Sequence, residues 1–178
     1  MRSWKKERDG TIIKDIVKYT KRFVAENCDN DVRIYVGTDS QNLRKRPWSG
    51  YISCIAFHVG KLEPDGEFYG KGVHIVYYPF KYKKIIDNFS RLWHEVTLSM
   101  ETAEELRSNG ILINRIDLDF NQDETHDSSR VVMAAEGLFR GLGYDVASKP
   151  EKLVASRAAD HIIHSIDWKN VELTDFKK

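Results

Sequence analysis

The sequence has few of the features that mark secreted, zinc-binding or membrane proteins. It contains two cysteines, Cys28 and Cys54, and they form no Cys-x-x-Cys pair, which argues against both a zinc cluster and a disulfide framework. No apolar run is long enough to span a bilayer, and the first residues lack the apolar segment of a secretory signal peptide. We therefore expect a protein of the reducing cytoplasm that does not associate with membranes.

An excess of charge of either sign is missing as well. The chain has 28 lysines and arginines against 27 acidic residues, a formal net charge of +1. Net charge therefore gives no support for a polyanionic partner, which would have to be bound by a local basic patch. The 178 residues are 41% hydrophobic and 31% charged and contain no repeat or low-complexity linker, which predicts one globular domain over 1–178.

Hydrophobic periodicity predicts an α/β fold. Helical spacing of apolar residues predicts an N-terminal helix over about 11–26, before a core over about 32–166. Apolar, β-branched runs predict five strands, over 33–38, 51–59, 72–80, 111–120 and 144–147. Further helices are predicted over about 83–108, 129–142 and 150–166. Three strands followed by alternating helices and strands predict one mixed, five-stranded sheet flanked by helices, with the N-terminal helix as an addition.

Three acidic residues lie on predicted strands or at their ends. Asp39 follows the strand 33–38 in Val-Gly-Thr-Asp-Ser-Gln, where an acid is explained either by a turn or by a metal ligand on a rigid element. Asp117 and Asp119 lie in Ile-Asp-Leu-Asp-Phe-Asn, and strand alternation places both on the face opposite the apolar residues. Two like charges on one face repel unless one reaches solvent or a cation lies between them. This pair therefore marks either a metal site or an exposed polar edge.

Two further acids lie near the apolar side of predicted helices. Glu95 falls about 60° from the centre of the apolar stripe of its helix, where an unpaired carboxylate would be costly. Asp160 shares a stripe with Ser156 and His164 beside the apolar side of the last helix. Acids that converge from strands and helices supply the oxygen ligands that Mg²⁺ prefers, and two such ions about 4 Å apart promote phosphodiester hydrolysis.

Three segments together resemble the YkuK-type family of ribonuclease H-like proteins. They are Gly37-Thr38-Asp39-Ser40-Gln41, Asp117-Leu118-Asp119-Phe120-Asn121, and the stretch from Lys149-Pro150 to Ala159-Asp160. The resemblance covers nearly everything from Val32 to Ile166, and the predicted order of elements matches the ribonuclease H fold. It implies a ribonuclease H-like sheet and places the chain among predicted nucleases whose substrate is not assigned.

The resemblance also implies roles for particular residues. Active members of the wider superfamily hydrolyse or transfer phosphodiesters with two Mg²⁺ or Mn²⁺ ions, and their four acids correspond here to Asp39, Glu95, Asp117 and Asp160. The family pattern Asp-x-x-x-Asn selects Asp117 with Asn121, whereas Asp119 stands where a small residue is usual. The metal ligand on that strand is therefore either Asp117 or Asp119.

Basic residues near Asp39 supply the local patch that the near-zero net charge requires. The loop after Asp39 carries the residues predicted to contact nucleic acid, which are Arg44, Lys45, Arg46 and Trp48. Cationic side chains suit phosphates, and an indole ring suits a base. A second basic cluster of Lys81, Lys83 and Lys84 surrounds Tyr82. Basic loops of this kind are also commonly only solvated.

These observations support three hypotheses. The first is a two-metal-ion-dependent nuclease acting on RNA, DNA or an RNA/DNA hybrid. In it, His126 of the polar loop after Asp119 is a candidate for proton transfer or simply a loop histidine. The second is a non-catalytic nucleic-acid-binding or scaffold domain on the same fold. The third, ranked last, is a transferase that holds Mn²⁺ and a nucleotide sugar through Asp117-x-Asp119, a pair that often occurs by chance.

Overall fold

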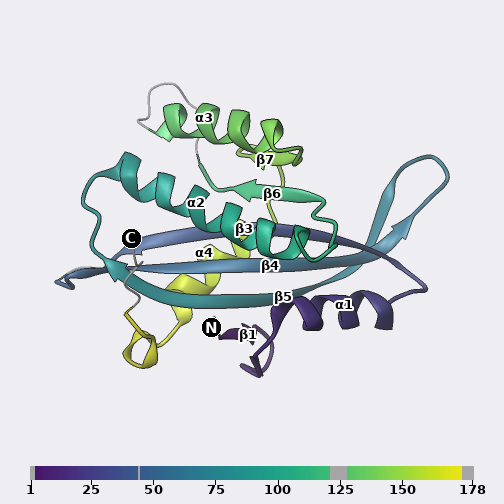
Figure 1. Ribbon diagram of the computed structural model, residues 1–178, viewed down its shortest axis with the longest axis horizontal. Coiled ribbons are helices and arrows are strands. Elements are labelled where there is room, and N and C mark those ends of the chain that lie inside the picture. The colour runs from purple at the N-terminus through teal and green to yellow at the C-terminus, as the bar shows by residue number, and fades with distance from the viewer. Residues whose placement is uncertain (1–2, 44, 121–127, 174–178) are drawn as a thin grey trace.

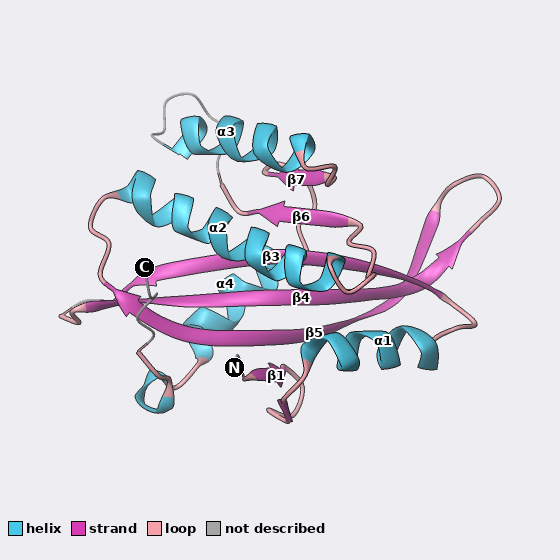
Figure 2. Ribbon diagram, in the orientation of Figure 1, coloured by secondary structure: helices cyan, strands magenta, loops and turns pink. Residues whose placement is uncertain are grey.

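One mixed sheet with helices on both faces forms the protein, and its computed structural model describes residues 3–43, 45–120 and 128–173 (Figure 1). Within these ranges seven strands follow the order β2-β1-β5-β4-β3-β6-β7 (Figure 2). The strands are β1 (Trp4–Lys6), β2 (Ile12–Ile13), β3 (Asp31–Asn42), β4 (Trp48–Leu62), β5 (Phe68–Lys83), β6 (Arg115–Leu118) and β7 (Val146–Ser148). The helices are α1 (Ile16–Glu26), α2 (Asn88–Arg107), α3 (Ser128–Gly141) and α4 (Ala155–Ser165), followed by the 3₁₀ helix η1 (Trp168–Asn170).

The centre of the sheet is a long antiparallel meander of β3, β4 and β5. The turn between β4 and β5 contains Gly66 at a φ of +87°, a conformation that glycine adopts without strain. On the other side of β3, β6 and β7 add in parallel, with α3 as the crossover between them. Since β3 and β6 run the same way, their carboxyl ends lie at the same end of the sheet. Gly37 is paired with Asp117, so Asp39 is level with the residue just after β6.

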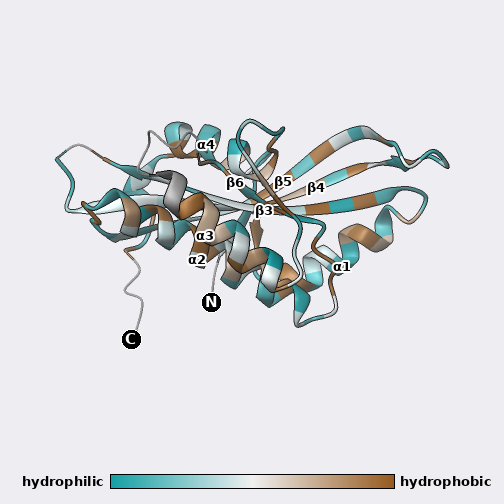
Figure 3. Ribbon diagram, turned by 90° about the horizontal axis from the view of Figure 1, so that it is seen from above, coloured by the Kyte–Doolittle hydropathy of each residue, from teal (hydrophilic) through white to brown (hydrophobic). Residues whose placement is uncertain are grey.

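Helices cover the two faces of the sheet unequally. The helices α1, α2 and α3 pack on one face, and α4 lies on the other (Figure 3). The larger core lies under the first three helices and includes the fully buried side chains of Phe57, Leu106 and Phe139. The smaller core joins α4 to β3 and β4 through small side chains such as Ala159 and Cys54. Small side chains let α4 approach the sheet closely.

The prediction of a five-stranded sheet is wrong, because the N-terminal segment adds two strands. Trp4 is 1% exposed, and β1 pairs with β5 on one side and with the edge strand β2 on the other. The predicted helix over 11–26 begins only at Ile16, because Ile12–Ile13 pairs with β1 as β2. Asp15 lies two residues after that strand and caps α1, its carboxylate accepting a hydrogen bond of 2.8 Å from the N–H of Lys18.

The remaining elements follow the predicted order with different bounds. The meander strands are longer than predicted, since pairing continues past their apolar centres to Asn42 and Lys83. The last helix begins at Ala155, because Pro150 lies in a turn before it. After the last helix, Trp168–Asn170 forms the short 3₁₀ helix η1. None of the helices in the described ranges combines the length and apolar character that crossing a membrane requires.

Candidate acidic active site

Residues of β3 alternate between the two helical layers, and this decides where each side chain points. Ser99 of α2 donates a hydrogen bond of 3.0 Å to Thr38, and Ser40 donates one to Glu95 of α2. Residues two apart on a strand share a face, so Thr38 and Ser40 both face α2. Asp39 therefore points to the opposite face, which α4 covers.

Asp117 is fully buried, and both of its carboxylate oxygens accept hydrogen bonds. The Nε–H of Arg115 donates to Oδ1 over 2.7 Å. The backbone N–H groups of Val154 and Ala155 donate to Oδ2 over 2.6 and 2.8 Å. These N–H groups open α4 and have no partner within the helix. Asp117 thus caps α4, where its negative charge also suits the helix dipole.

Gly37 allows α4 to lie directly on this part of the sheet. A Cβ atom at Gly37 would lie 2.7 Å from the backbone nitrogen of Ser156 and 3.0 Å from the carbonyl oxygen of Asp117. Real side chains do not approach that closely, so any larger residue would push the helix away. Together, Gly37 and Asp117 hold the start of α4 in place and thereby set the position of Asp160, one turn and a half further along the helix.

Asp39 is partly buried and lies among other acids. Burial raises its pKa to about 6; the backbone N–H of Ser40 opposes this, the charges of Asp160 and Asp119 add to it, and the charge of Arg91 opposes it. Two of the predicted acids, Asp160 and Asp119, therefore lie near enough to Asp39 for their charges to act on it. An acid with a raised pKa among like charges is a typical feature of a functional site.

Asp119 follows β6 directly and differs from its neighbour Asp117. Its side chain is 13% exposed and faces the ammonium group of Lys149, whose Nζ lies 2.6 Å from Oδ1. The two groups form an ion pair without hydrogen-bond geometry, and Oδ1 accepts no hydrogen bond from the described residues. Unlike Asp117, Asp119 therefore keeps oxygen lone pairs for a further ligand.

Glu95 approaches the same end of the sheet from α2 and is 2% exposed. Its Oε1 accepts hydrogen bonds from Ser40 and, over 3.2 Å, from Arg91. Burial, followed by the charge of Asp39, raises the pKa of Glu95 well above its usual range, while Ser40 and Arg91 act against this rise. Glu95 is therefore a buried acid whose pKa depends on the charge of Asp39, although the two side chains lie on opposite sides of β3.

Asp160 is the most exposed of the predicted acids, with 55% of its side chain accessible. His164, one turn later on α4, places its Nε2 atom 3.4 Å from the carboxylate. The Nδ1 atom of the same ring lies 3.4 Å from Nε2 of Gln41 on β3. This chain of contacts links α4 to β3 beyond Asp39 and leaves the Asp160 carboxylate open to solvent.

The donor chemistry of these acids fits a hard divalent cation. Asp39, Asp119 and Asp160 offer only oxygen atoms, which Mg²⁺ and Mn²⁺ accept. Asp39 lies near the like charges of Asp160 and Asp119, and a bound cation would relieve this repulsion. In the described ranges, however, no three acidic, His or Cys side chains are gathered tightly enough to hold an ion. The residue types therefore fit the metal, but in the described ranges their side chains do not converge on a single point.

Two cations at this site were not among the predicted residues. Arg91 contacts Ser40 through hydrogen bonds of 3.0 and 2.6 Å and reaches Glu95, which it precedes by four residues. That spacing is a recognisable signal for an ion pair on a helix. Lys149 has no comparable signal, because it lies thirty residues after Asp119 and reaches it only through the fold.

The predicted nucleic-acid-binding loop is only partly described. Arg44, like Asn121 and His126 of the loop after β6, lies outside the described residues. Lys45 and Arg46 are exposed, and Lys45 has a φ of +59°, which is uncommon for a side chain with a Cβ. Arg46 and Trp48 line a hollow of about 700 Å³ beside η1. The loop therefore presents positive charge and an aromatic ring at the start of β4.

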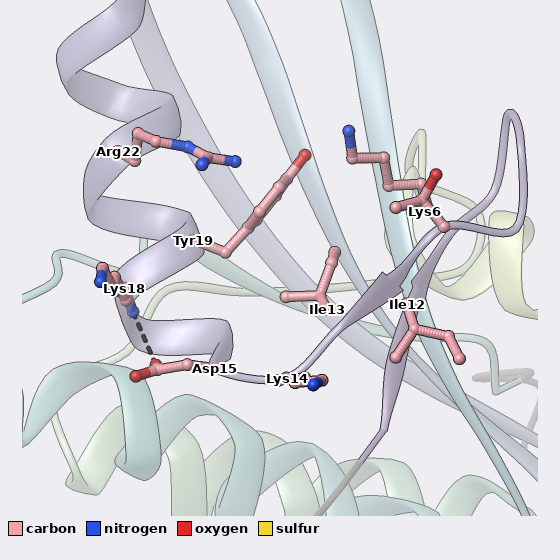
Figure 4. Close-up of a pocket in the computed structure, with 9 residues that line it drawn as sticks. Lys6, Ile12, Ile13, Lys14, Asp15, Lys18, Tyr19 and Arg22 are labelled. Atoms are coloured by element: carbon pink, nitrogen blue, oxygen red, sulfur yellow. Dashed lines mark hydrogen bonds between the residues drawn. The ribbon is translucent and has the colours of Figure 1, made fainter.

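A second basic hollow, of about 250 Å³, lies between α1 and the first two strands. Figure 4 shows the ring of Tyr19 between Lys6 and Arg22, whose charged groups lie 5.7 and 5.6 Å from its centroid. Lys14 and Lys18 also border this hollow. None of the predicted acids lines it, so it is separate from the acidic site.

A family model described as ribonuclease H-like matches residues 15–164. The chain belongs to the ribonuclease H-like family. This match covers the acids Asp39, Glu95, Asp119 and Asp160 and ends before η1. Proteins of the ribonuclease H-like family generally depend on divalent metal ions, in line with the donor chemistry above. Comparison with curated proteins and with solved structures gave no match.

Proposed function

We propose that this ribonuclease H-like protein is a metal-dependent nuclease of the YkuK type that hydrolyses phosphodiester bonds in RNA, DNA or an RNA/DNA hybrid. The observation that carries the proposal is the position of Asp39, partly buried within β3 beside the carboxyl end of β6, with the charges of Asp160 and Asp119 near it. Burial of Asp39 beside like charges is costly, and a bound divalent cation would offset that cost.

We assign the metal-holding role to Asp39, Asp119 and Asp160, with Glu95 as a further acid. Asp117 was the alternative ligand on its strand, and its full set of hydrogen bonds favours an anchoring role instead. Two bound Mg²⁺ or Mn²⁺ ions would supply activation of water and stabilisation of the leaving oxygen. The chain itself orients the acids: α4 carries Asp160 on the anchor of Asp117, and α2 brings Glu95 to β3.

The basic groups beside the acids suit the charge of a phosphodiester backbone. Arg91 is 19% exposed and reaches the end of β3, and Lys149 is 47% exposed beside Asp119. In the nuclease, both would contribute positive charge near the scissile phosphate. Arg46 and Trp48, at the start of β4, would hold the nucleic acid further from the reacting bond.

A cleavage assay tests this function. End-labelled RNA, DNA and hybrid strands, single-stranded and duplex, are incubated with Mg²⁺, Mn²⁺ or EDTA. We expect cleavage with metal, none with EDTA, and a loss in Asp39→Asn on the order of a thousandfold, which corresponds to several kcal/mol of lost metal stabilisation. Asp145→Asn, a change at an exposed acid before β7, is the matched control and should cleave like the wild type. Equal activity of the two variants would reject the site.

A second function, binding without cleavage, has its own supporting observation. The cations Lys149 and Arg91 already neutralise Asp119 and Glu95, which is an arrangement that stands without metal. A wild-type protein that binds the labelled strands equally well in Mg²⁺ and in EDTA, and cleaves none of them, would favour this non-catalytic role over the nuclease.

A further inference from the structure

The hollow beside η1 contains two tryptophans that come from distant parts of the sequence. Trp48 opens β4, and Trp168 lies in η1 after the last helix. Their ring centroids are 5.6 Å apart at an interplanar angle of 46°, and both residues line the hollow. Both rings are only partly buried. The hollow that they line has a volume of about 700 Å³, enough for a nucleotide.

The fold holds these rings in place. Trp168 lies directly over Gly50 of β4, where a Cβ atom would come within 2.5 Å of its ring. Its indole N–H donates a hydrogen bond of 3.3 Å to the carbonyl oxygen of Ile163 in α4. The ammonium group of Lys81 lies 4.8 Å from the ring centroid of Trp48. The absence of a side chain at Gly50 therefore allows the ring of Trp168 to lie directly on β4.

The charge of the hollow is mainly positive. Lys81, Arg46 and Lys169 line it, and among the described residues of its lining the one carboxylate belongs to Asp167. That carboxylate accepts a hydrogen bond of 3.0 Å from the backbone N–H of Lys169 and so caps η1. Three cations against one engaged acid make a surface suited to phosphate groups.

The hollow lies on the same face of the sheet as Asp39. Asp39 pairs with Ile52, whose side chain belongs to the core under α4, and Gly50 and Trp48 follow on that face at two-residue steps. Trp48 is four residues from Ile52, or about 14 Å along the strand. That distance corresponds to about four phosphate steps of a duplex strand, and to fewer in an extended single strand.

We propose that the hollow binds an unpaired nucleotide of the nucleic acid whose backbone passes Asp39. Its base stacks against Trp48 and Trp168, and its phosphate contacts Lys81, Arg46 and Lys169. Aromatic rings stack on the face of a base, which is accessible only where the base is not stacked within a duplex. The proposal rests on the proposed function for its link to Asp39, and it makes a single-stranded segment the preferred substrate.

Binding measured without cleavage tests the proposal. Short fluorescent RNA and DNA strands are titrated with the protein in EDTA, in three forms: single-stranded, blunt duplex, and a strand of abasic sugar phosphates. We expect the single strand to bind best. Trp168→Leu and Trp48→Leu should each bind it roughly tenfold to a hundredfold more weakly, the range for loss of one stacked base. Tyr69→Leu removes an exposed ring at the far end of β5 and is the matched control.

The wild-type protein alone also decides the question, should a tryptophan variant fail to fold. An abasic strand that binds as tightly as the natural strand, or a blunt duplex that binds more tightly, would overturn the proposal. So would tryptophan variants that fold and bind like Tyr69→Leu. Because the titration contains no metal, a protein that cleaves nothing can still support this pocket, and a protein that cleaves can still refute it.

Discussion

Asp117 and Asp39 lie two residues apart in register on neighbouring strands, yet their surroundings are opposite. Asp117 is fully buried and accepts hydrogen bonds from Arg115 and from the two N–H groups that open α4. Asp39 is partly buried, accepts one from a backbone N–H, and faces the charges of Asp160 and Asp119. The charge of the Asp117 carboxylate is stabilised by groups of the fold. The charge of the Asp39 carboxylate is stabilised only when a proton or a cation binds. The difference separates an acid that builds the site from one that acts in it.

Removal of the Asp117 carboxylate should cause the largest change. Asp117→Ala leaves Arg115 and two buried N–H groups without an acceptor, and breaking such a pair costs about 3 to 5 kcal/mol. Urea unfolding in EDTA measures the free energy of unfolding, with Asp145→Ala as the exposed control. A loss below about 1 kcal/mol in Asp117→Ala would show that the anchor is not needed and would weaken the contrast with Asp39.

Substitution of Asp39 should change the free energy of unfolding in the opposite direction, toward higher stability, in metal-free buffer. Its folded pKa of about 6 lies above the ordinary value of 3.8, so its stabilising effect is present below about pH 4 and is lost as the pH rises through 6. Asp39→Asn removes this dependence and should be more stable than the wild type by up to about 3 kcal/mol at pH 8, with no difference near pH 4.

Urea unfolding of Asp39→Asn and wild type across that pH range measures the difference. Addition of Mg²⁺ should stabilise the wild type and not the variant, because only the wild type keeps the Asp39 carboxylate that coordinates the ion. A variant that is less stable than the wild type at pH 8 without metal would contradict the role given to Asp39.

Gly37 tests whether the anchor positions the acids. Gly37→Ala places a Cβ against the backbone of α4 and should cost about 1 to 3 kcal/mol, as overpacking does. It should also lower the cleavage rate by more than the fraction of unfolded protein explains, since α4 carries Asp160. Gly137→Ala in α3 is the control of opposite sign: its Cβ meets open space, and alanine favours the helix by about 1 kcal/mol. Equal stabilities of the two variants would refute the close approach.

Lys149 should give the smallest effect. Its side chain is half-exposed, and pairs of this kind contribute about 0 to 1 kcal/mol. Lys149→Met should therefore change the free energy of unfolding by less than about 1 kcal/mol, while Mg²⁺ binding tightens because a competing cation is gone. Isothermal titration with Mg²⁺ measures the second effect. A large loss of stability would mean that Asp119, like Asp117, is a structural acid.

Much of the fold was predictable because it depends on local patterns. Apolar periodicity predicted α2, α3 and α4, and β-branched runs predicted the meander and the strand of Asp117. The N-terminal strands were not predictable in this way, since β1 has three residues and is held by pairing with β5 and by burial of Trp4. Tertiary pairing of a short, charged segment leaves no periodic signal.

The sequence by itself determined the family and the candidate acids, because these depend on residue types at fixed spacing around Asp39. Only the tertiary structure separated Asp117 from Asp119. Both have the same local pattern, and the difference comes from α4, whose first N–H groups reach Asp117 from 37 and 38 residues away. The same holds for Trp168, which meets Trp48 only because η1 folds back over Gly50. Contacts between distant segments depend on how those segments pack together, and the sequence of one segment alone does not predict that packing.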